Sequence, residues 1–416
     1  MSSGSADAPS GGVRSWETGC CVVGGGPAGM MLGYLLARAG IEVTVLEKHG
    51  DFFRDFRGDT IHPATTDVLA ELGLLEEFLR LPHTEVPELR LGVDGHTYGL
   101  VDFRHLPTRC KFMAFMPQWD FLTFLATQAQ QRYPAFRLEM STEATGLLRD
   151  DDRAADRVTG VRARTPDGEV RIHAELTVAC DGRFSLVRQH AGLPAREFAV
   201  PIDVLWFRLP RGQDAPPTLG YFGGGQIVLA IDRGDYWQCG TIIAKGTLAQ
   251  VQAEGLDTFR ARIARAAPFL TSGLDTLTDW DQVKLLSVRA DRLRRWYHPG
   301  LLCIGDAAHA MSPAGAAGIN YAIADAVATA NHLTTPLRTG TLTVTDLRRV
   351  QQRREPPVRR AQALQRRQTR QIARLARANP PLRTIRFLSR ATPVKRFLGR
   401  IIGLGLRPEH IHDPST

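Results

Sequence analysis

The segment that most constrains the fold is residues 21–47, CVVGGGPAGMMLGYLLARAGIEVTVLE. A short apolar run leads into Gly24, Gly26 and Gly29, a helical pattern follows, and a second β-branched run ends at the acid Glu47. A strand, a G-x-G-x-x-G turn, a helix and a strand that ends in an acid form a dinucleotide-binding fingerprint. Its glycines allow a tight turn, close approach of a pyrophosphate and close helix packing, and the helix N-terminus attracts phosphate. The segment therefore predicts a Rossmann-type unit for NAD or FAD, with Glu47 on a ribose.

The composition is that of an ordinary globular protein. The chain has 416 residues, 43% hydrophobic and 23% charged, enough for two or three domains. No apolar run approaches the ~18 residues of a membrane span. Residues 1–17 are rich in Ser, Gly and Ala and contain no apolar signal segment, so we expect a disordered tail and a cytoplasmic protein. The six cysteines form no C-x-x-C pair, which favours free thiols and no metal site.

The positive charge is concentrated in the C-terminal segment. Residues 341–416 hold 18 of the 52 Lys+Arg and 4 of the 43 Asp+Glu. Within this segment, one apolar stripe has helical spacing and consists of Val394, Phe397, Leu398, Ile401 and Ile402. Such a helix can lie on a membrane surface or pack on the body with a solvated basic face, and we expect packing. No nucleic-acid reading element is visible, so nucleic acid is not expected as a partner.

Patterns along the chain predict an α/β protein whose nucleotide-binding strands are interrupted twice. A hairpin is expected over 89–103 around Asp94-Gly95, and a helix over 116–130. A second sheet is expected over about 200–290, with strands at 204–207, 226–231 and 237–244. A strand at 300–304 leads through a Gly-rich turn into a helix that ends near residue 333. An Arg-rich helix over 346–378 is expected to end at Pro380-Pro381.

Three further motifs accompany the fingerprint. Asp181-Gly182 follows a strand and is followed by Arg188, and Gly305-Asp306 precedes the segment PAGAAGIN at 313–320. Arg57 and Gln118 flank the first interruption.

With these motifs in order over residues 19–335, the chain resembles the flavin-dependent aromatic hydroxylases of the para-hydroxybenzoate hydroxylase type, the group A flavoprotein monooxygenases. The resemblance implies a Rossmann-like FAD-binding domain with an inserted antiparallel β-sheet substrate domain and C-terminal helices. The FAD-binding domain would comprise 18–80, 110–199 and 291–335, the substrate domain 81–109 and 200–290, and the basic helices 336–416. FAD would be resident, and NADPH or NADH would bind transiently, without a second G-x-G-x-x-G motif.

The resemblance also implies roles for individual residues. The ADP half of FAD would be held by Gly24, Gly26, Pro27, Ala28, Gly29 and Glu47. The ribityl chain and phosphates would be contacted by Arg57, Gln118, Gly305 and Asp306. Asp181, Gly182 and Arg188 would serve both FAD and the nicotinamide cofactor. The loop under the isoalloxazine ring would be Pro313, Gly315, Gly318, Ile319 and Asn320, with Pro313 also counted among the catalytic residues.

The implied reaction is hydroxylation of a small aromatic compound by O2. NAD(P)H would reduce the flavin, O2 would form a C4a-hydroperoxide, and one oxygen would pass to an electron-rich ring. The family's substrate hairpin carries a serine and an arginine for a carboxylate, whereas residues 226–231 here read QIVLAI. This departure favours a larger, more apolar aromatic or polyketide-like substrate.

The substrate side leaves several readings open. His62 is a candidate general base for a phenol, or it is simply hydrogen-bonded beside Pro63. Trp206, Tyr221 and Trp237 either line the pocket or belong to the core. The alternatives for the whole chain are an epoxidase or reductase acting on a prenyl-type lipid, which the basic C-terminal helix would favour, and a non-catalytic flavin-binding protein.

Overall fold

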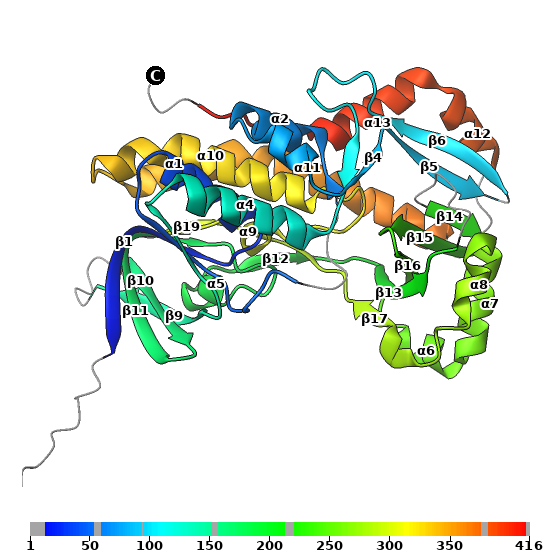
Figure 1. The fold of residues 1–416 in the computed structure, drawn as a ribbon, viewed down its shortest axis with the longest axis horizontal. Coiled ribbons are helices and arrows are strands. Elements are labelled where there is room, and N and C mark those ends of the chain that lie inside the picture. Colours follow the sequence, from blue (N-terminus) through cyan, green and yellow to red (C-terminus); the bar gives the residue numbers. More distant parts are fainter. Residues whose placement is uncertain are drawn as a thin grey trace, which may run out of the picture.

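The computed structural model describes residues 13–53, 60–93, 95–150, 156–212, 220–375 and 382–412. Two sheets lie at opposite ends of an elongated molecule, and helices run between and over them (Figure 1). The predicted α/β class is confirmed.

The first sheet is the nucleotide-binding one. Its centre is β1 (Arg14–Val23), which pairs in parallel with β2 (Val43–Leu46) and β11 (Gly168–Ala179). Parallel pairing continues outward to β8 (Phe136–Glu139) and β20 (Leu301–Cys303), which gives the order β20-β11-β1-β2-β8. The antiparallel additions are β9 (Glu143–Arg149), β10 (Val158–Thr165) and β19 (Tyr297–His298). The expected tail over 1–17 is too long, because residues 14–17 pair with 170–173 of β11.

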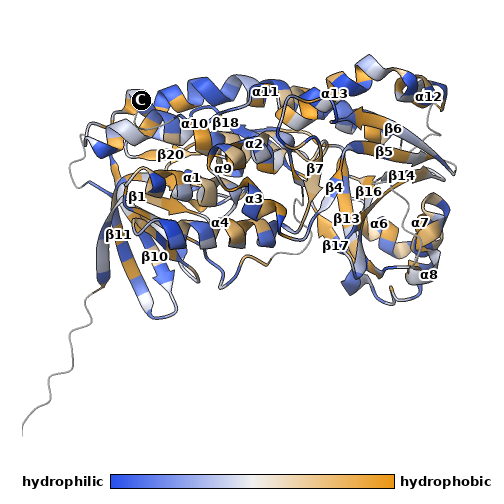
Figure 2. Cartoon of the chain, turned by 45° about the horizontal axis from the view of Figure 1, so that its top comes forward, coloured by the Kyte–Doolittle hydropathy of each residue, from blue (hydrophilic) through white to orange (hydrophobic). Residues whose placement is uncertain are grey.

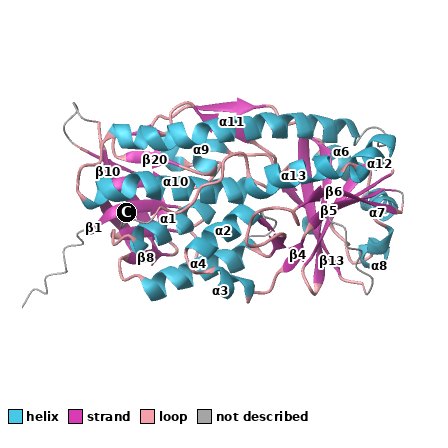
Figure 3. Cartoon of the chain, turned by 90° about the horizontal axis from the view of Figure 1, so that it is seen from above, coloured by secondary structure: helices cyan, strands magenta, loops and turns pink. Residues whose placement is uncertain are grey.

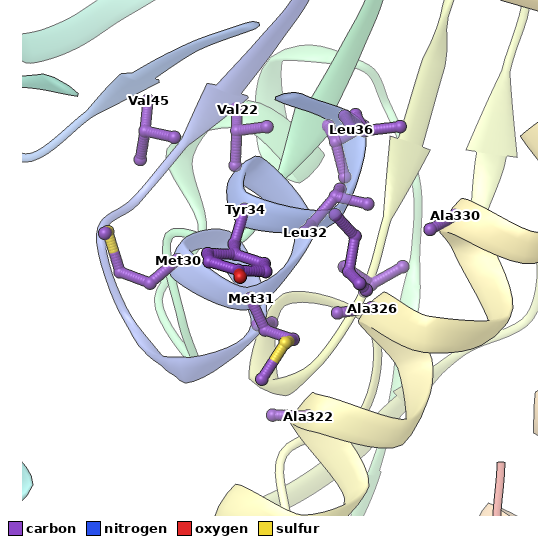
Figure 4. Close-up of a cluster of buried hydrophobic side chains, with 14 of the residues drawn as sticks. Val22, Met30, Met31, Leu32, Tyr34, Leu36, Val45, Ala322, Ala326 and Ala330 are labelled. Carbon is purple, nitrogen blue, oxygen red and sulfur yellow. The ribbon is translucent and has the colours of Figure 1, made fainter. Parts of the chain in front are cut away.

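Helices cover this sheet closely. They include α1 (Pro27–Arg38), α4 (Gln118–Arg132) and α10 (Gly318–Arg338). All ten residues from Ala28 to Ala37 in α1 are buried, so the helix lies between the sheet and α10 instead of presenting a polar face to solvent. Figure 4 shows α1 side chains against the alanines of α10, at Ala322, Ala326 and Ala330, whose small side chains allow the two helices to approach closely.

The second sheet contains seven strands in the order β17-β13-β16-β15-β14-β5-β6. The strands are β5 (Glu88–Val93), β6 (His96–Asp102), β13 (Ile202–Pro210), β14 (Gly220–Gly223), β15 (Gln226–Asp232), β16 (Tyr236–Ala244) and β17 (Lys284–Leu286). The β5–β6 hairpin predicted around Asp94-Gly95 is confirmed. It joins the later strands through a parallel pairing with β14. On this pairing we propose that segments 81–109 and 200–290 form one domain.

Smaller elements complete the chain. Two small sheets are formed by β3 (Thr60–Ile61), β4 (Thr84–Val86) and β7 (Met113–Phe115), and by β12 (Ala195–Phe198) and β18 (Ala290–Leu293). The short helices are α2 (Pro63–Glu71), α3 (Leu75–Leu79), α5 (Leu186–His190), α6 (Leu248–Ala253), α7 (Leu256–Ala266), α8 (Thr271–Leu274), α9 (Asp306–His309), η1 (Pro268–Leu270) and η2 (Trp280–Gln282). The six cysteines are all free thiols.

Three helices form the C-terminal segment, namely α11 (Val344–Leu375), α12 (Leu382–Arg390) and α13 (Thr392–Leu404). The long α11 is largely hydrophilic (Figure 2) and spans from the first sheet to the second (Figure 3). Its far end places Ile372 and Ala373 in an apolar cluster with the second sheet. The prolines at 380–381 lie outside the described residues.

The last helix packs on the body, as expected. Leu398, Ile402 and Leu404 of α13 join the same apolar cluster as Ile372. At Gly399 the helix approaches the backbone so closely that an added Cβ would lie 1.9 Å from the Asp102 carbonyl oxygen. Among the described residues, no helix has the length and apolar character needed to cross a membrane.

Candidate cofactor and active site

Four motifs that are distant in the sequence meet at one edge of the first sheet. Glu47 follows β2, Gly24 follows β1, Asp181 comes just after β11, and Gly305 comes just after β20. These strands are parallel and adjacent in the order β20-β11-β1-β2, so their carboxyl ends lie side by side. Ligands of such sheets bind at this edge.

The glycines of the fingerprint have different surroundings. Gly24 has φ +108°, and an added Cβ would lie 2.5 Å from the Cys180 carbonyl oxygen. At Gly29 an added Cβ would lie 2.0 Å from the Gly24 oxygen, which shows how closely α1 packs on the turn. At Gly26, just before α1, an added Cβ would meet no atom of the described part of the chain within 4 Å. Gly24 and Gly29 thus serve packing, whereas Gly26 leaves room where phosphate would approach the helix.

Three other motif glycines have similarly open surroundings. At Gly182, Gly315 and Gly318, an added Cβ would meet no atom of the described residues within 4 Å. A ligand lying along the edge could therefore contact the backbone at each of these positions. This arrangement fits an extended dinucleotide such as FAD.

Two carboxylates stand beside this space. Glu47 accepts a hydrogen bond from the Gly25 N–H at 3.1 Å and from the His49 N–H at 3.2 Å. A carboxylate oxygen can accept more than one hydrogen bond, so Glu47 is suited to bind a ribose hydroxyl pair. Asp306 is half-buried and opens α9, with the Arg183 guanidinium 3.9 Å away.

Asp181 has one carboxylate oxygen whose partner is not supplied by the described protein. Its Oδ2 accepts from the Val187 N–H at 3.2 Å, whereas Oδ1 is buried without a hydrogen-bond partner among the described residues. Burial raises the pKa of Asp181, against the opposing effect of the Ser185 hydroxyl and nearby backbone N–H groups. Because buried polar atoms are nearly always paired, Oδ1 points to a donor outside the described residues, such as a ligand hydroxyl or water.

Arg188 has protein partners instead of an open position. Its guanidinium forms a buried two-point ion pair with Asp291 of β18, at 3.2 and 3.0 Å. It also donates to the carbonyl oxygens of Arg183 and Ala307. The structure therefore does not support direct contact of Arg188 with a cofactor. Instead, the side chain joins the Asp181 loop, β18 and α9.

The loop before α10 is held by polar contacts with β3 and with the start of α2. Gly315 and Ala316 have φ of +82° and +53°. The Ala316 carbonyl accepts a hydrogen bond from the Thr60 hydroxyl at 3.1 Å and lies 2.8 Å from His62 Nε2. The side-chain oxygen of Asn320 accepts from Thr65 at 3.0 Å. The first N–H groups of α10, from Gly318 onward, have no partner within the helix. They present the positive end of a long helix at this loop.

His62 is fully buried, and both of its ring nitrogens face backbone carbonyls. Nδ1 lies 2.7 Å from the Ile402 oxygen and Nε2 lies 2.8 Å from the Ala316 oxygen. Burial lowers the pKa of His62, and the two carbonyls oppose that shift. Since neither nitrogen is directed toward open space, the structure favours the hydrogen-bonded histidine over the general base.

Sequence reasoning missed a buried polar network behind Gly305. Asp325 on α10 accepts from the Gly305 N–H, from His309 and from Arg354 of α11. Arg354 in turn contacts Glu409 at 3.0 Å. Arg354 is one of many arginines in its helix, so no sequence pattern marks it as buried.

An apolar wall of the second sheet faces the loop region. Trp206, Leu229, Ile231 and Ile242 belong to the apolar cluster that includes Phe115, which pairs with Thr60 next to the Ala316 loop. Tyr221 and Trp237 lie in a different cluster, on the α7 and α8 side. Of the three aromatics considered, only Trp206 is thus placed toward the candidate site.

The remaining predicted cofactor contacts are Arg57 and Gln118. Arg57 lies outside the described residues. Gln118 is the half-buried first residue of α4, and the adjacent Trp119 packs on Phe53 with ring centroids 4.8 Å apart. This contact brings the start of α4 next to the segment that leads toward Arg57.

Comparisons with known proteins support an FAD-binding fold. A family model described as an FAD binding domain matches residues 17–364. A 6-methylpretetramide 4-monooxygenase of Streptomyces rimosus is 35% identical over 393 residues, which make up 94% of this chain and 93% of that protein. A solved Diels–Alderase of pyrroindomycin biosynthesis has a TM-score of 0.75 at 25% identity, over 95% of this chain and 82% of its own. An anhydrotetracycline hydroxylase of Streptomyces rimosus has the same fold, with a TM-score of 0.74 at 22% identity, over 96% and 78%.

Proposed function

Since the chain belongs to the FAD-binding domain family and is a flavin-dependent monooxygenase, we propose that it hydroxylates a fused-ring, polyketide-like aromatic compound. The oxygen would come from O2 and the electrons from NADPH or NADH. The relative named for 6-methylpretetramide makes that compound the first substrate to test.

The observation that carries the substrate class is the apolar wall of the second sheet. On the face toward the Ala316 loop, β15 presents Ile227, Leu229 and Ile231, and β13 presents Val204 and Trp206. A wall of this kind favours a broad apolar ring system, at roughly 25 cal/mol for each Å² of apolar surface buried.

A buried polar side chain on this face already has a hydrogen-bond partner. Gln238 of β16 pairs across strands with Arg208 and Ile231, and it accepts from Arg233 at 3.1 Å. Arg208 and Arg233 lie beside Gln238, so the preference for a fused-ring compound over a simple hydroxybenzoate rests on the apolar wall.

The protein's own groups would bind and orient the reactants. The backbone at Gly26 and the start of α1 would hold the pyrophosphate, and Glu47 would accept from the adenosine ribose. Once bound, FAD supplies the redox chemistry that activates O2. The start of α10 would stabilise negative charge that develops on the ring system, an effect worth up to ~2 kcal/mol in partly buried sites.

Other residues would fix geometry and exclude water. Thr60 and His62 hold the Ala316 carbonyl and thereby the loop beneath the ring. The apolar wall would orient the substrate and keep water from the reaction. We propose that His62 is a positioning residue and that Pro313 and Gly315 shape the loop surface.

The test measures substrate-stimulated oxygenation. Purified protein is expected to be yellow or to become yellow with FAD. NADPH and NADH oxidation is followed in air with 6-methylpretetramide, with other fused-ring phenols and with 4-hydroxybenzoate. The expected result is stimulation by fused-ring phenols alone, with one atom of 18O from 18O2 in the product. Stimulation by 4-hydroxybenzoate alone would contradict the proposed substrate class. A protein that takes up no FAD would contradict the proposal as a whole.

A further inference from the structure

The C-terminal segment 392–409 is connected by two buried polar bridges to the two loops of the cofactor site. We propose that this segment is a clamp that sets the affinity for FAD and the position of its ring, with Arg354 and Glu409 as positioning residues. The proposal rests on the proposed function, because it concerns the same FAD site.

The first bridge runs from the end of the chain to the Gly305 loop. Glu409 accepts from Arg354 Nη1 at 3.0 Å, and Arg354 Nε donates to Asp325 Oδ1 at 2.8 Å. The second oxygen of Asp325 accepts from the Gly305 N–H at 3.0 Å and lies 2.5 Å from His309 Nε2. Only the turn at Gly305 separates this bridge from Asp306, the expected ribityl contact.

Every member of the first bridge is buried. Arg354 and Asp325 are 1% and 0% exposed, and Arg353 adds a two-point contact to Glu409. Burial by itself would raise the pKa of Asp325, but His309 and Arg354 hold it below its ordinary value. Asp325 is therefore a carboxylate, and its orientation depends on the position of Arg354. Loss of one partner from such a buried network leaves an uncompensated charge.

The second bridge reaches the loop before α10. The Ile402 carbonyl is in the last turn of α13, where carbonyls have no partner within the helix. His62 lies between the two loops, with Nδ1 2.7 Å from this carbonyl and Nε2 2.8 Å from the Ala316 carbonyl. The neutral ring donates a hydrogen bond to one of the two carbonyls and packs against the other. The Ala316 loop, expected beneath the flavin ring, is thus tied to the same C-terminal segment as the Gly305 loop.

The C-terminal segment also offers a matched control. Lys395 of α13 forms a mostly buried ion pair with Glu88 of β5 at 3.0 Å. That pair fixes the segment to the second sheet and touches neither cofactor loop. If the clamp acts through its two bridges, the Glu409 bridge affects FAD, and the Lys395 pair, which contacts neither loop, does not. If the segment only packs on the body, the two substitutions change FAD binding solely by lowering the stability of the fold.

The experiment compares Glu409→Gln with Lys395→Met in the full chain. Apoprotein of each variant is titrated with FAD, its dissociation rate is measured, and the visible spectrum of the bound flavin and the melting temperature are recorded. We expect Glu409→Gln to weaken FAD binding about tenfold, which is 1.4 kcal/mol, with faster release and a shifted flavin spectrum. Glu409→Asp should restore part of the affinity. Lys395→Met should lower the melting temperature and leave the FAD dissociation constant unchanged.

Two outcomes would overturn the clamp. One is a Glu409→Gln protein with wild-type FAD affinity and spectrum. The other is a loss of FAD affinity in both variants that follows their loss of thermal stability. If Glu409→Gln does not fold, Arg353→Gln provides the second variant, because it removes one of the two cations on Glu409. A wild-type protein that binds no FAD would instead refute the proposed function, which keeps the two failures distinct.

Discussion

Gly26→Ala separates binding of the cofactor from stability of the fold. Gly26 precedes α1 with φ −76° and ψ −177°, a conformation that alanine adopts. Among the residues that the structure describes, an added Cβ would meet no atom within 4 Å. Alanine restricts the unfolded chain and so stabilises by about 0.4–1 kcal/mol. It is also a poorer N-cap than glycine by about 0.5 kcal/mol. The two effects nearly cancel, so the apoprotein should melt within about 2 °C of the wild type.

The effect on FAD should be much larger. The added methyl group would occupy the space through which the pyrophosphate reaches the N–H groups of α1. One charge-assisted hydrogen bond is worth about 1.5–3 kcal/mol, so its loss should weaken FAD binding at least about tenfold. Fluorescence titration of the apoprotein with FAD measures this change, and differential scanning calorimetry of the apoprotein measures stability.

Gly29→Ala is the contrasting variant. Its Cβ would lie 2.0 Å from the Gly24 carbonyl oxygen, so α1 must move and stability should fall by about 1–3 kcal/mol.

Wild-type FAD affinity in Gly26→Ala, at an unchanged melting temperature, would show that the pyrophosphate does not lie at this turn.

Three further predictions concern buried polar groups. Arg188→Met should destabilise the protein by about 3–5 kcal/mol in chemical denaturation, because Asp291 is left as a buried unpaired charge; a change below 1 kcal/mol would mean that the ion pair is dispensable. His62→Ala should speed FAD release but keep turnover per bound FAD and its pH profile, since the ring orients a loop and contacts no substrate; loss of the fall in activity at low pH, where a general base becomes protonated, would restore the general base. Asp325 has a folded pKa below its ordinary value, so its contribution to stability is present above the unfolded pKa of about 3.9 and is lost as pH falls through the lower folded pKa. Acid denaturation should therefore begin in this range, and Asp325→Asn should flatten that part of the curve.

Local patterns were sufficient for the elements of the cofactor site. The G-x-G-x-x-G turn, the Asp181-Gly182 strand end and the Gly305-Asp306 turn are each short-range signals, because a glycine turn or a β-branched strand is encoded within a few residues. Parallel strands place their carboxyl ends together, so these local assignments were enough to predict that the motifs meet at one edge of the sheet. The relation to the flavoprotein monooxygenases was likewise visible in the order of the motifs.

Long-range partners could not be read in the same way. Arg188 was assigned to the cofactor because of its place in a motif, but Asp291 lies 103 residues away and binds its guanidinium. His62 looked like a base because of its residue type, yet both of its partners are backbone carbonyls, at residues 316 and 402. Carbonyl groups are present at every position, so the sequence does not indicate which of them a side chain meets.

The sequence by itself determined that the chain carries a Rossmann-type FAD unit, an inserted sheet and a basic C-terminal segment. The tertiary structure decided what that segment does. Its positive charge suggested a solvated surface, and most of α11 is indeed hydrophilic (Figure 2), but Arg354 is buried and joins Glu409 to Asp325. Burial of one arginine among many depends on which helix face meets the body. That choice is made by packing between distant segments, and composition does not record it.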